Sequence, residues 1–450
     1  MKNTRIILLL LSTLVFACVH ASGHVPAHPG RFVAYRSKMG ITGKIESARL
    51  RELTKFPTDA YARFGMLLIN GKFKRLEDAT TLQCLDNSKI KTEDLSLYLM
   101  CLEMKASAEL ATGDFPSLAA SILQMRGVVS QINHAYNYAI TGTYETSWMS
   151  DPKAIDRSNS PTFVDNHSTG TISLNAKCQQ QDHGYYGVVA KVNGIRTCFT
   201  LDTGSNVSSL SYATARKLGI RPTNTRFHGI TQSTVTLGLA SRISLARYTV
   251  NNFYFGIFPK KIAEPAQNIL GMDFLVHLHS ILFSHSHIYL NSSTPHGCVP
   301  TFLRFAYTGR FLGPIIVFKV QINGRNARLL FDSGLSNNMV LFSPSKFDLR
   351  LHQTTQKVLD GINGSNDGVQ GYSLIKLDFD KGPQIFLPTL IINRSAFAED
   401  PGIDMDGAFG LTPETLSGLN VFLDFNSGLA CIINPSNPRS NPAARVILRH

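Results

Sequence analysis

The spacing of apolar residues divides the chain into three parts. Residues 45–138 place apolar side chains at helical intervals, with few strand signals between them. Residues 139–183 are rich in Ser, Thr, Asn, Asp, Gln and Gly and hold only scattered apolar positions. In residues 184–437, short β-prone apolar runs alternate with turns that carry Gly or Asn. The pattern therefore predicts a helical domain, a linker and a β-rich region, in that order.

The helical domain contains two similar segments. Residues 68–76 and 110–118 match at Leu, Gly, Phe and Leu with an offset of 42 positions, which resembles tetratricopeptide-like helical hairpins. Such a domain is expected to dock a protein partner or the substrate. Because fold alone does not fix function, a helical cap or an inhibitory pro-segment remains the alternative.

Within the β-rich region, one pattern occurs twice. An apolar run follows Gly194 and stops at Asp202, and a second run follows Gly324 and stops at Asp332. In each copy the glycine belongs to an Asn-Gly pair and precedes the aspartate by eight positions. Asn-Gly between apolar runs is a strong hairpin signal, so each aspartate is predicted to end the second strand of a β-hairpin.

Both copies continue alike downstream. Asn268–Leu275 and Gly407–Leu416 each contain two apolar residues, a glycine and a predicted helix start. A repeat with such constant spacing predicts two copies of a β-rich lobe. We place lobe one at residues 184–297 and lobe two at residues 298–437.

The repeated motifs carry a resemblance to a known family. Two apolar residues before Asp-Thr-Gly or Asp-Ser-Gly, followed about seventy residues later by two apolar residues and a Gly, resemble the pepsin and retropepsin aspartic proteases. The closest likeness is to the bacterial retropepsin-like type, and it covers roughly residues 160–437. It implies an all-β bilobed acid-protease fold, with two tandem β-barrel-like lobes after an α-helical repeat-like domain.

The same resemblance implies an activity. Asp202 and Asp332 are expected to meet as the catalytic dyad of an aspartic endopeptidase that binds an extended peptide and works as a monomer. Two carboxylates about 3 Å apart cannot both be ionised, so they share a proton. One can then take a proton from water while the other donates to the scissile carbonyl. This chemistry calls for no metal and no cofactor.

Four neighbouring residues are expected to support the dyad. In the family, the hydroxyl after each aspartate bonds across the pseudo-dyad, which implies this role for Thr203 and Ser333. The small size of Gly204 and Gly334 leaves room for main-chain N–H groups to point at the carboxylates.

The two turns differ at one position. Ser205 is expected to bond the outer oxygen of Asp202, whereas lobe two has Leu335 at the corresponding place. Loss of a hydrogen bond to the charged form raises the proton affinity of a carboxyl group. Asp332 is therefore predicted to be the protonated member of the pair.

Each lobe has a Gly-bearing segment where the family carries a flap over the cleft. The candidate flap residues are Gly229, Ile230, Gly361 and Ile362. Pepsin-like flaps bear a tyrosine, and none lies near Gly229, which favours the retropepsin type. The missing tyrosine and Leu335 also leave an alternative open, a catalytically inactive protease-like scaffold that binds peptides or regulates a partner.

The N-terminus reads as an export signal. Residues 1–21 have a charged start, a short apolar run and a small-residue cleavage site, which predicts a signal peptide and a periplasmic or secreted protein. Lipid anchoring through Cys18 is the alternative, and no stretch is long enough for a transmembrane helix. Residues 22–44 form an N-terminal segment, and residues 438–450 are expected to be a disordered tail.

Export to an oxidising compartment would allow the cysteines to form disulfides. Six remain after residue 21, an even set that suits three disulfides in an oxidising compartment. Cys84 with Cys101 is the first pair expected, and the pairing of the other four stays open. Cys198 and Cys431 fall in predicted strands, where a buried apolar thiol is the alternative.

Other site chemistries are not favoured. The net charge is +13, but Lys and Arg are dispersed and no aromatic-basic motif accompanies them, so no nucleic-acid partner is predicted. The histidines at positions 277, 279, 285 and 287 lack a carboxylate or cysteine at useful spacing. No metal site is therefore predicted.

Overall fold

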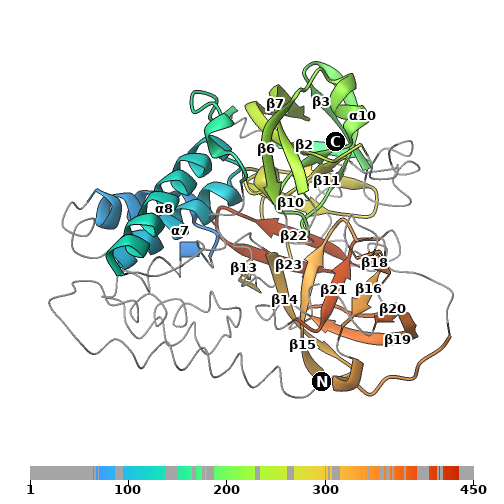
Figure 1. Ribbon diagram of the computed structural model, residues 1–450. Coiled ribbons are helices and arrows are strands. Elements are labelled where there is room, and N and C mark those ends of the chain that lie inside the picture. Colours follow the sequence, from blue (N-terminus) through green and yellow to red (C-terminus); the bar gives the residue numbers. More distant parts are fainter. Residues whose placement is uncertain are drawn as a thin grey trace, which may run out of the picture.

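The computed structural model describes most of the chain between residues 64 and 434 (Figure 1). The described residues are 64, 67–68, 70–86, 95–136, 149–164, 169–174, 178, 187–228, 234–260, 268–298, 301–302, 305–306, 315–335, 337–342, 344–353, 359–360, 365–366, 369–379, 382–392, 405–412, 415 and 419–434. Several predictions lie outside them: the signal peptide, the N-terminal segment, the tail, and the flap residues Gly229, Ile230, Gly361 and Ile362.

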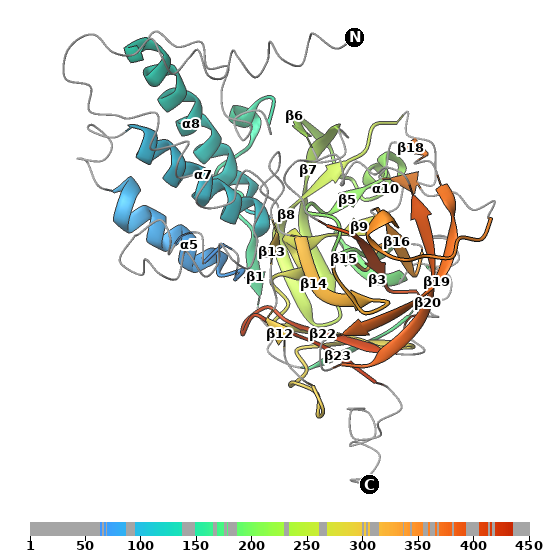
Figure 2. The same cartoon turned by 90° about the horizontal axis from the view of Figure 1, so that it is seen from below.

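The helices before residue 137 gather at one side of the molecule (Figures 1 and 2). We call them the helical module, and they are α5 (Phe73–Thr80), the π-helical turn η1 (Thr81–Leu85), α7 (Leu95–Ala111) and α8 (Phe115–Tyr136). The N–H of Ser117 bonds to Asp114, which satisfies one of the free donors at the start of α8. Leu102, Leu110, Leu118 and Ile122 are fully buried. Burial of these apolar faces holds the helices together.

Lobe one is an eight-stranded sheet that curls into a barrel-like form. Its order is β1-β8-β5-β9-β4-β3-β7-β6, with a further pairing of β7 and β8. Its elements are β1 (Thr162–Val164), β3 (Gly187–Val192), β4 (Ile195–Leu201), β5 (Ser209–Leu210), α10 (Tyr212–Lys217), β6 (Pro222–His228), β7 (Thr234–Leu245), β8 (Tyr248–Ile257), β9 (Ile269–Leu270) and α11 (Met272–Leu275).

Lobe two repeats this plan with seven strands. Its order is β13-β14-β15-β21-β16-β20-β19, and β14 also pairs with β19. Its elements are β13 (Phe305–Ala306), β14 (Ile315–Ile322), β15 (Arg325–Asp332), β16 (Met339–Leu341), η4 (Pro344–Lys346), β19 (Val369–Phe379), β20 (Gln384–Ile392) and β21 (Gly407–Gly410). A separate two-stranded ribbon pairs β17 (Leu359–Asp360) with β18 (Ser365–Asn366).

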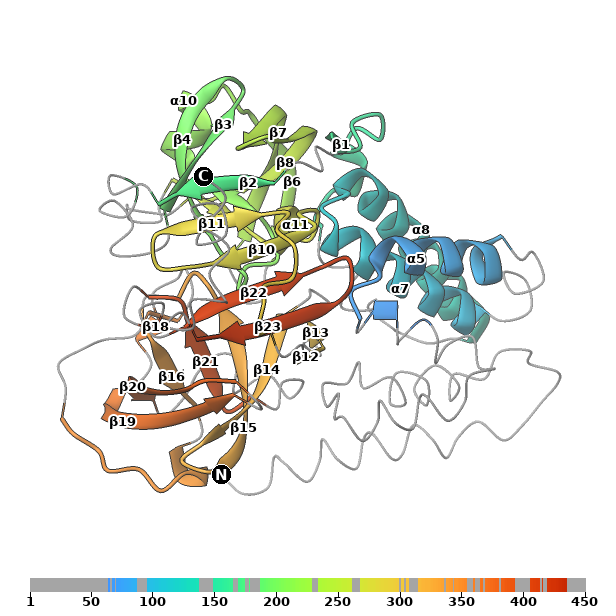
Figure 3. The same cartoon turned by 180° about the vertical axis from the view of Figure 1, so that it is seen from behind.

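A third sheet joins the lobes (Figure 3). Its order is β12-β23-β22-β10-β11-β2. Its strands are β2 (Gly170–Ser173), β10 (Ser280–Phe283), β11 (His287–Leu290), β12 (Thr301–Phe302), β22 (Asn420–Asp424) and β23 (Leu429–Ile433). Strand β10 of lobe one pairs with β22 of lobe two, with Leu282 opposite Phe422. The lobes therefore share main-chain hydrogen bonds as well as packed side chains.

The two predicted hairpins are confirmed. Strands β3 and β4 are joined by Asn193 and Gly194, with φ of 49° and 84°, and β14 and β15 by Asn323 and Gly324, with φ of 49° and 79°. Asn and Gly adopt positive φ at low cost, and two such residues in a row make the tight turn that suits twisted strands.

Residues 149–174 do more than link two domains. Strand β1 pairs with β8 of lobe one, and β2 pairs with β11 of the joining sheet. The helix η3 (Pro152–Ala154) lies between α8 and β1 in the chain. The described part of the predicted linker thus contains two paired strands.

Three disulfides are present within the described residues. They are Cys84–Cys101, Cys178–Cys198 and Cys298–Cys431. The first is the pair expected from the sequence, and the other two resolve a pairing that the sequence left open. The alternative view of Cys198 and Cys431 as free buried thiols is therefore wrong.

Among the helices of the described residues, none has the length and apolar character to cross a bilayer.

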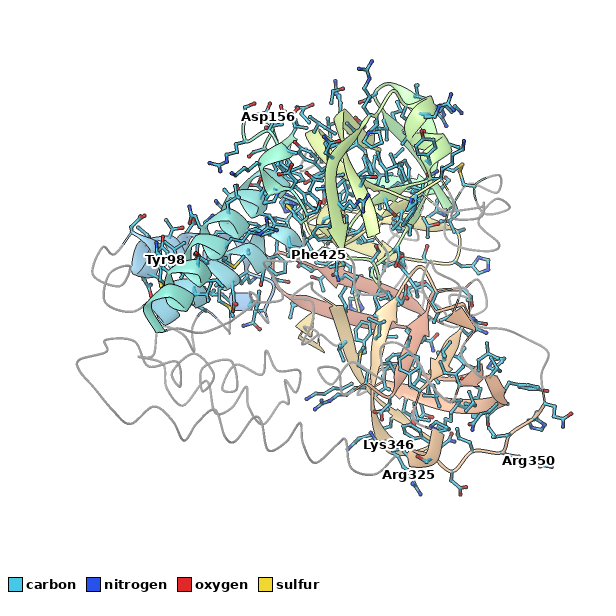
Figure 4. All side chains as sticks on the ribbon, viewed as in Figure 1. Tyr98, Asp156, Arg325, Lys346, Arg350 and Phe425 are labelled. Carbon is cyan, nitrogen blue, oxygen red and sulfur yellow. A yellow bond between two sulfur atoms is a disulfide. The ribbon has the colours of Figure 1, made fainter. Side chains whose placement is uncertain are left out.

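The helical module contacts both lobe one and the joining sheet. The ring of Phe115 at the start of α8 packs edge-on against Phe227 of β6, with centroids 5.6 Å apart. Lys72, just before α5, donates to the carbonyl of Asn426 in the turn between β22 and β23. Figure 4 labels Phe425 at this turn. The module is thus fixed to the β-rich body at more than one place.

Candidate active site

Asp202 and Asp332 occupy equivalent places in the two lobes. Strand β4 runs parallel to β9, and the N–H of Asp202 donates to the carbonyl of Leu270 at 3.0 Å. Strand β15 runs parallel to β21, with Asp332 opposite Gly410. Each aspartate therefore stands at a strand end beside the second repeated motif of its own lobe.

Thr203 and Ser333 bind the two turns together. The N–H of Thr203 donates to Ser333 Oγ, and the N–H of Ser333 donates to Thr203 Oγ1, both at 3.0 Å. The Thr203 hydroxyl donates to the carbonyl of Phe331 at 2.9 Å, and the Ser333 hydroxyl donates to that of Leu201 at 2.7 Å. Both side chains are buried. These four reciprocal bonds fix the relative position of the aspartates.

The two glycines allow the turns to meet. Gly204 N–H donates to Asp202 Oδ1 at 2.8 Å, and Gly334 N–H donates to Asp332 Oδ1 at 2.9 Å. A Cβ added to Gly204 would lie 2.5 Å from Asp332 Cγ, and one added to Gly334 would lie 2.5 Å from Asp202 Cγ. Each glycine thus packs against the carboxyl group of the opposite lobe, where no larger residue fits.

The two carboxyl groups are in hydrogen-bond contact and favour a shared proton. Burial raises the pKa of Asp202. Burial also raises the pKa of Asp332 well above its ordinary value, and the negative charge of Asp202 raises it further. Main-chain N–H groups of the turns oppose these shifts, because they stabilise the ionised forms. Both carboxyl groups therefore hold a proton more readily than an isolated aspartate does, and the pair titrates as a unit.

Ser205 does not have the role that the sequence suggested. Its hydroxyl donates to the carbonyl of Val207 at 3.0 Å, within its own loop, and not to the outer oxygen of Asp202. Serine side chains commonly close such local turns two residues on. The N–H groups of Ser205 and Leu335 both lower the pKa of their own aspartate. The raised pKa of Asp332 therefore comes from burial and from the charge of Asp202, and not from Leu335.

A buried carboxyl group behind the first turn was missed by the sequence analysis. Asp273 of α11 is fully buried, and both of its oxygens accept from the N–H of Ser208 at 2.9 Å. The Ser208 hydroxyl also donates to Asp273 Oδ1 at 2.6 Å. Burial raises the pKa of Asp273 to about 7. Its signal was an acidic residue inside the apolar run Met272–Leu275.

Lobe two has a neutral version of this contact. Asn338 stands 130 positions after Ser208, and Thr412 follows Gly410 as Asp273 follows Gly271. Here the hydroxyls of Thr412 and Thr415 donate to the amide oxygen of Asn338. The two lobes therefore have a hydrogen-bonded polar pair at equivalent positions, and only the pair in lobe one contains an ionisable group.

The stems of both predicted flaps are β-ribbons. His228 pairs with Thr234 at the end of β6 and β7, and Asp360 pairs with Ser365 in the β17–β18 ribbon. The predicted tip residues lie between these pairs and outside the described part of the chain. The flap role stays a prediction.

Three of the four clustered histidines have protein partners. His277 Nε2 lies 2.8 Å from the carbonyl of Thr112, His279 contacts Asn426, and His287 Nδ1 lies 2.7 Å from the Ser286 hydroxyl. In the part of the chain that the structure describes, no group of three or more His, Cys, Asp or Glu side chains is placed to hold a metal ion.

Comparison with known proteins gives two findings. Residues 188–274 match the protein family described as aspartyl protease, a segment that contains Asp202 and the first downstream glycine motif. A retropepsin-like aspartic protease from Rickettsia conorii is 16% identical, with a TM-score of 0.21, and the alignment covers 29% of this chain and 93% of that one. No curated protein matches the chain. The aspartyl protease match supports a protease-like function.

Proposed function

We propose that the chain is a retropepsin-like aspartic endopeptidase that hydrolyses peptide bonds with a water molecule activated between Asp202 and Asp332. One observation carries the proposal: the reciprocal hydrogen bonds of Thr203 and Ser333 bring two carboxyl groups of one chain into contact. The family match over residues 188–274 adds independent support. No observation favours the inactive scaffold.

The proposed reaction needs one ionised and one protonated carboxyl group in the pair. Ionised Asp202 takes a proton from water as the water oxygen attacks the scissile carbonyl carbon, while protonated Asp332 donates its proton to the carbonyl oxygen. The tetrahedral intermediate then collapses. Its C–N bond breaks, the amine leaves with a proton from the dyad, and a hydroxyl proton of the intermediate returns to the dyad. One proton is again shared between the carboxyl groups.

The substrate we propose is an extended peptide. A chain in β conformation can pair with strand edges at the cleft and place alternate side chains in pockets. Because one chain supplies both aspartates, a monomer suffices. We further propose export to the periplasm or the exterior. The N-terminal signal pattern and the three disulfides support this, since disulfides persist in oxidising compartments.

Cleavage of an unfolded protein between pH 3 and 7 tests the proposal. Asp202→Asn and Asp332→Asn should each lower kcat by roughly a thousandfold or more, because a neutral amide can neither accept nor return the shared proton. The exposed Asp348→Asn is the matched control and should keep wild-type activity. A statine-type inhibitor should block the wild type. A folded wild-type chain without cleavage or inhibitor binding would replace this proposal with the scaffold alternative.

A further inference from the structure

The turn between α7 and α8 lies directly on helix α11 of lobe one (Figure 3). Gly113 in this turn has a φ of +68°, and a Cβ added to it would lie 3.2 Å from the carbonyl oxygen of Asp273. Next to it, the carbonyl of Thr112 lies 2.8 Å from His277 Nε2. A carbonyl oxygen only accepts, so His277 donates and carries its proton on Nε2. Helix α11 and the turn are thus in close main-chain contact.

His277 is enclosed on its other face as well. The ring of Phe163 in β1 stacks on the imidazole, with ring centroids 3.4 Å apart. The hydroxyl of Tyr248 donates to the carbonyl of His277 at 2.7 Å. The imidazole therefore joins three parts of the chain: the helical module, strand β1 and the end of α11.

Helix α11 is in turn bonded to the loop that carries Asp202. The N–H of Met272 donates to the carbonyl of Ser205 at 2.7 Å, and that of Asp273 donates to the carbonyl of Asn206 at 3.3 Å. Gly271 has no room for a side chain, since an added Cβ would lie 2.7 Å from the Ser205 oxygen. Ser208 closes the loop onto the carboxyl group of Asp273. A continuous run of short contacts leads from the turn to Asp202.

We propose that the turn Thr112-Gly113 and the side chain of His277 are positioning residues for the Asp202 loop, residues 202–208. The helical module is then a working part of the active site and not only a docking arm, a cap or a removable pro-segment. This inference rests on the proposed aspartic protease function. The turn presses on α11, α11 holds the loop, and the loop sets the distance between the two carboxyl groups.

A single methyl group tests this route. Gly113→Ala places a Cβ against the main chain of Asp273, and hydrogen exchange of the amides in residues 202–208 reports the loop in the full chain without any need for activity. We expect exchange to become roughly tenfold faster. We also expect kcat to fall by roughly ten- to a hundredfold with KM within about twofold, because misplacement by a fraction of an ångström affects the chemical step more than binding.

Gly127→Ala is the matched control. Gly127 lies in α8 of the same module, and an added Cβ would have no atom within 4 Å. This variant should leave exchange in residues 202–208 and the kinetics unchanged. A second pair tests His277: His277→Gln can still donate to the Thr112 carbonyl and should keep most of the activity, whereas His277→Leu should behave like Gly113→Ala. This pair decides the matter if Gly113→Ala does not fold.

The outcomes separate the two proposals. Wild-type exchange in residues 202–208 of folded Gly113→Ala, or equal behaviour of the Gln and Leu variants, would overturn the positioning role. A lower free energy of unfolding in Gly113→Ala, with kcat and KM both at their wild-type values, would also overturn it. If the wild type cleaves nothing, the proposed function fails, while hydrogen exchange still decides whether the module holds the loop.

Discussion

At the scale of single residues, the two Asp-Thr/Ser-Gly turns act as one unit. Gly204 and Gly334 are needed because each lies against the carboxyl group of the opposite lobe. An added Cβ would come too close to that carboxyl group. Both positions therefore require glycine because a side chain would clash with the other lobe. Its backbone freedom is not the reason, since neither glycine has a positive φ. The sequence showed both triplets, but only the fold shows that each glycine serves the aspartate of the other lobe.

Gly204→Ala and Gly334→Ala should abolish cleavage. The added Cβ would push the opposing aspartate aside, and the change should also cost roughly 1–3 kcal/mol in the free energy of unfolding, as overpacking does. Peptidase assays and urea unfolding measure the two effects. Gly170→Ala, whose Cβ would meet only ordinary contacts at 3.7 Å or more, is the control. Near-normal activity in either glycine variant would contradict the interlocked geometry.

Thr203→Val and Ser333→Ala should each lower the free energy of unfolding by about 1–3 kcal/mol, because each leaves buried N–H and carbonyl groups of the opposite turn unpaired. The double variant should cost less than the sum of the two, since the four bonds form one network that holds the same two turns together. Urea unfolding of the four chains measures this coupling. Thr197→Val, on strand β4, which leads into the turn of Thr203, should stay within about 0.5 kcal/mol. Strict additivity would mean that the two hydroxyls act independently.

At the scale of elements, local signals predicted the hairpins but not their partners. Asn193-Gly194 fixes a turn through its own backbone preferences, so β3 and β4 could be placed from the sequence. The pairing of β10 with β22 joins residues about 140 positions apart, and no local preference encodes it. The disulfide Cys298–Cys431 stayed open for the same reason. Helix α11 was expected, whereas its contact with the helical module depends on the tertiary fold.

The buried pair Ser208–Asp273 makes the stability of α11 depend on pH. The folded-state pKa of Asp273 is about 7, above the ordinary 3.8, so the folded chain holds a proton that the unfolded chain has lost between these values. The stabilising contribution of this group is full below pH 3.8 and declines as pH rises towards 7. Asp273→Asn should therefore gain stability relative to the wild type as pH rises from 4 to 8, by up to about 4 kcal/mol.

The stability contribution of His277, two residues after the end of α11, should change with pH in the opposite direction. Its pKa is lowered by burial to about 4, below the ordinary 6.5, so the unfolded chain binds the extra proton and stability is lost as pH falls from 6.5 to 4. Urea unfolding at pH 4, 5.5, 7 and 8 separates the two groups. His277→Gln should flatten the acid side and Asp273→Asn the neutral side, with exposed Asp348→Asn as the control. Identical pH profiles in all chains would refute both assignments.

At the scale of the whole molecule, the two lobes resemble each other in plan and differ in surroundings. Lobe one contacts the helical module, and it has a buried acid, Asp273, behind the turn that carries Asp202. Lobe two has the neutral Asn338–Thr412 pair behind the turn that carries Asp332. The unequal settings favour different proton affinities in two carboxyl groups that the repeat alone would make equivalent. In the proposed mechanism, such an asymmetry would separate the acid from the base before a substrate arrives.

The joining sheet should make the lobes unfold together. Leu282 and Phe422 face each other across it and are fully buried. Phe422→Ala should cost about 3–5 kcal/mol through the cavity that it leaves, and should turn one calorimetric transition into two as the lobes lose their common core. Phe386→Ala, at a side chain that is 64% exposed, should leave a single transition near the wild-type temperature. Two transitions in the wild type would show that each lobe is stable by itself. In that case the four hydrogen bonds of Thr203 and Ser333, and not the sheet, would be the main link that keeps Asp202 beside Asp332.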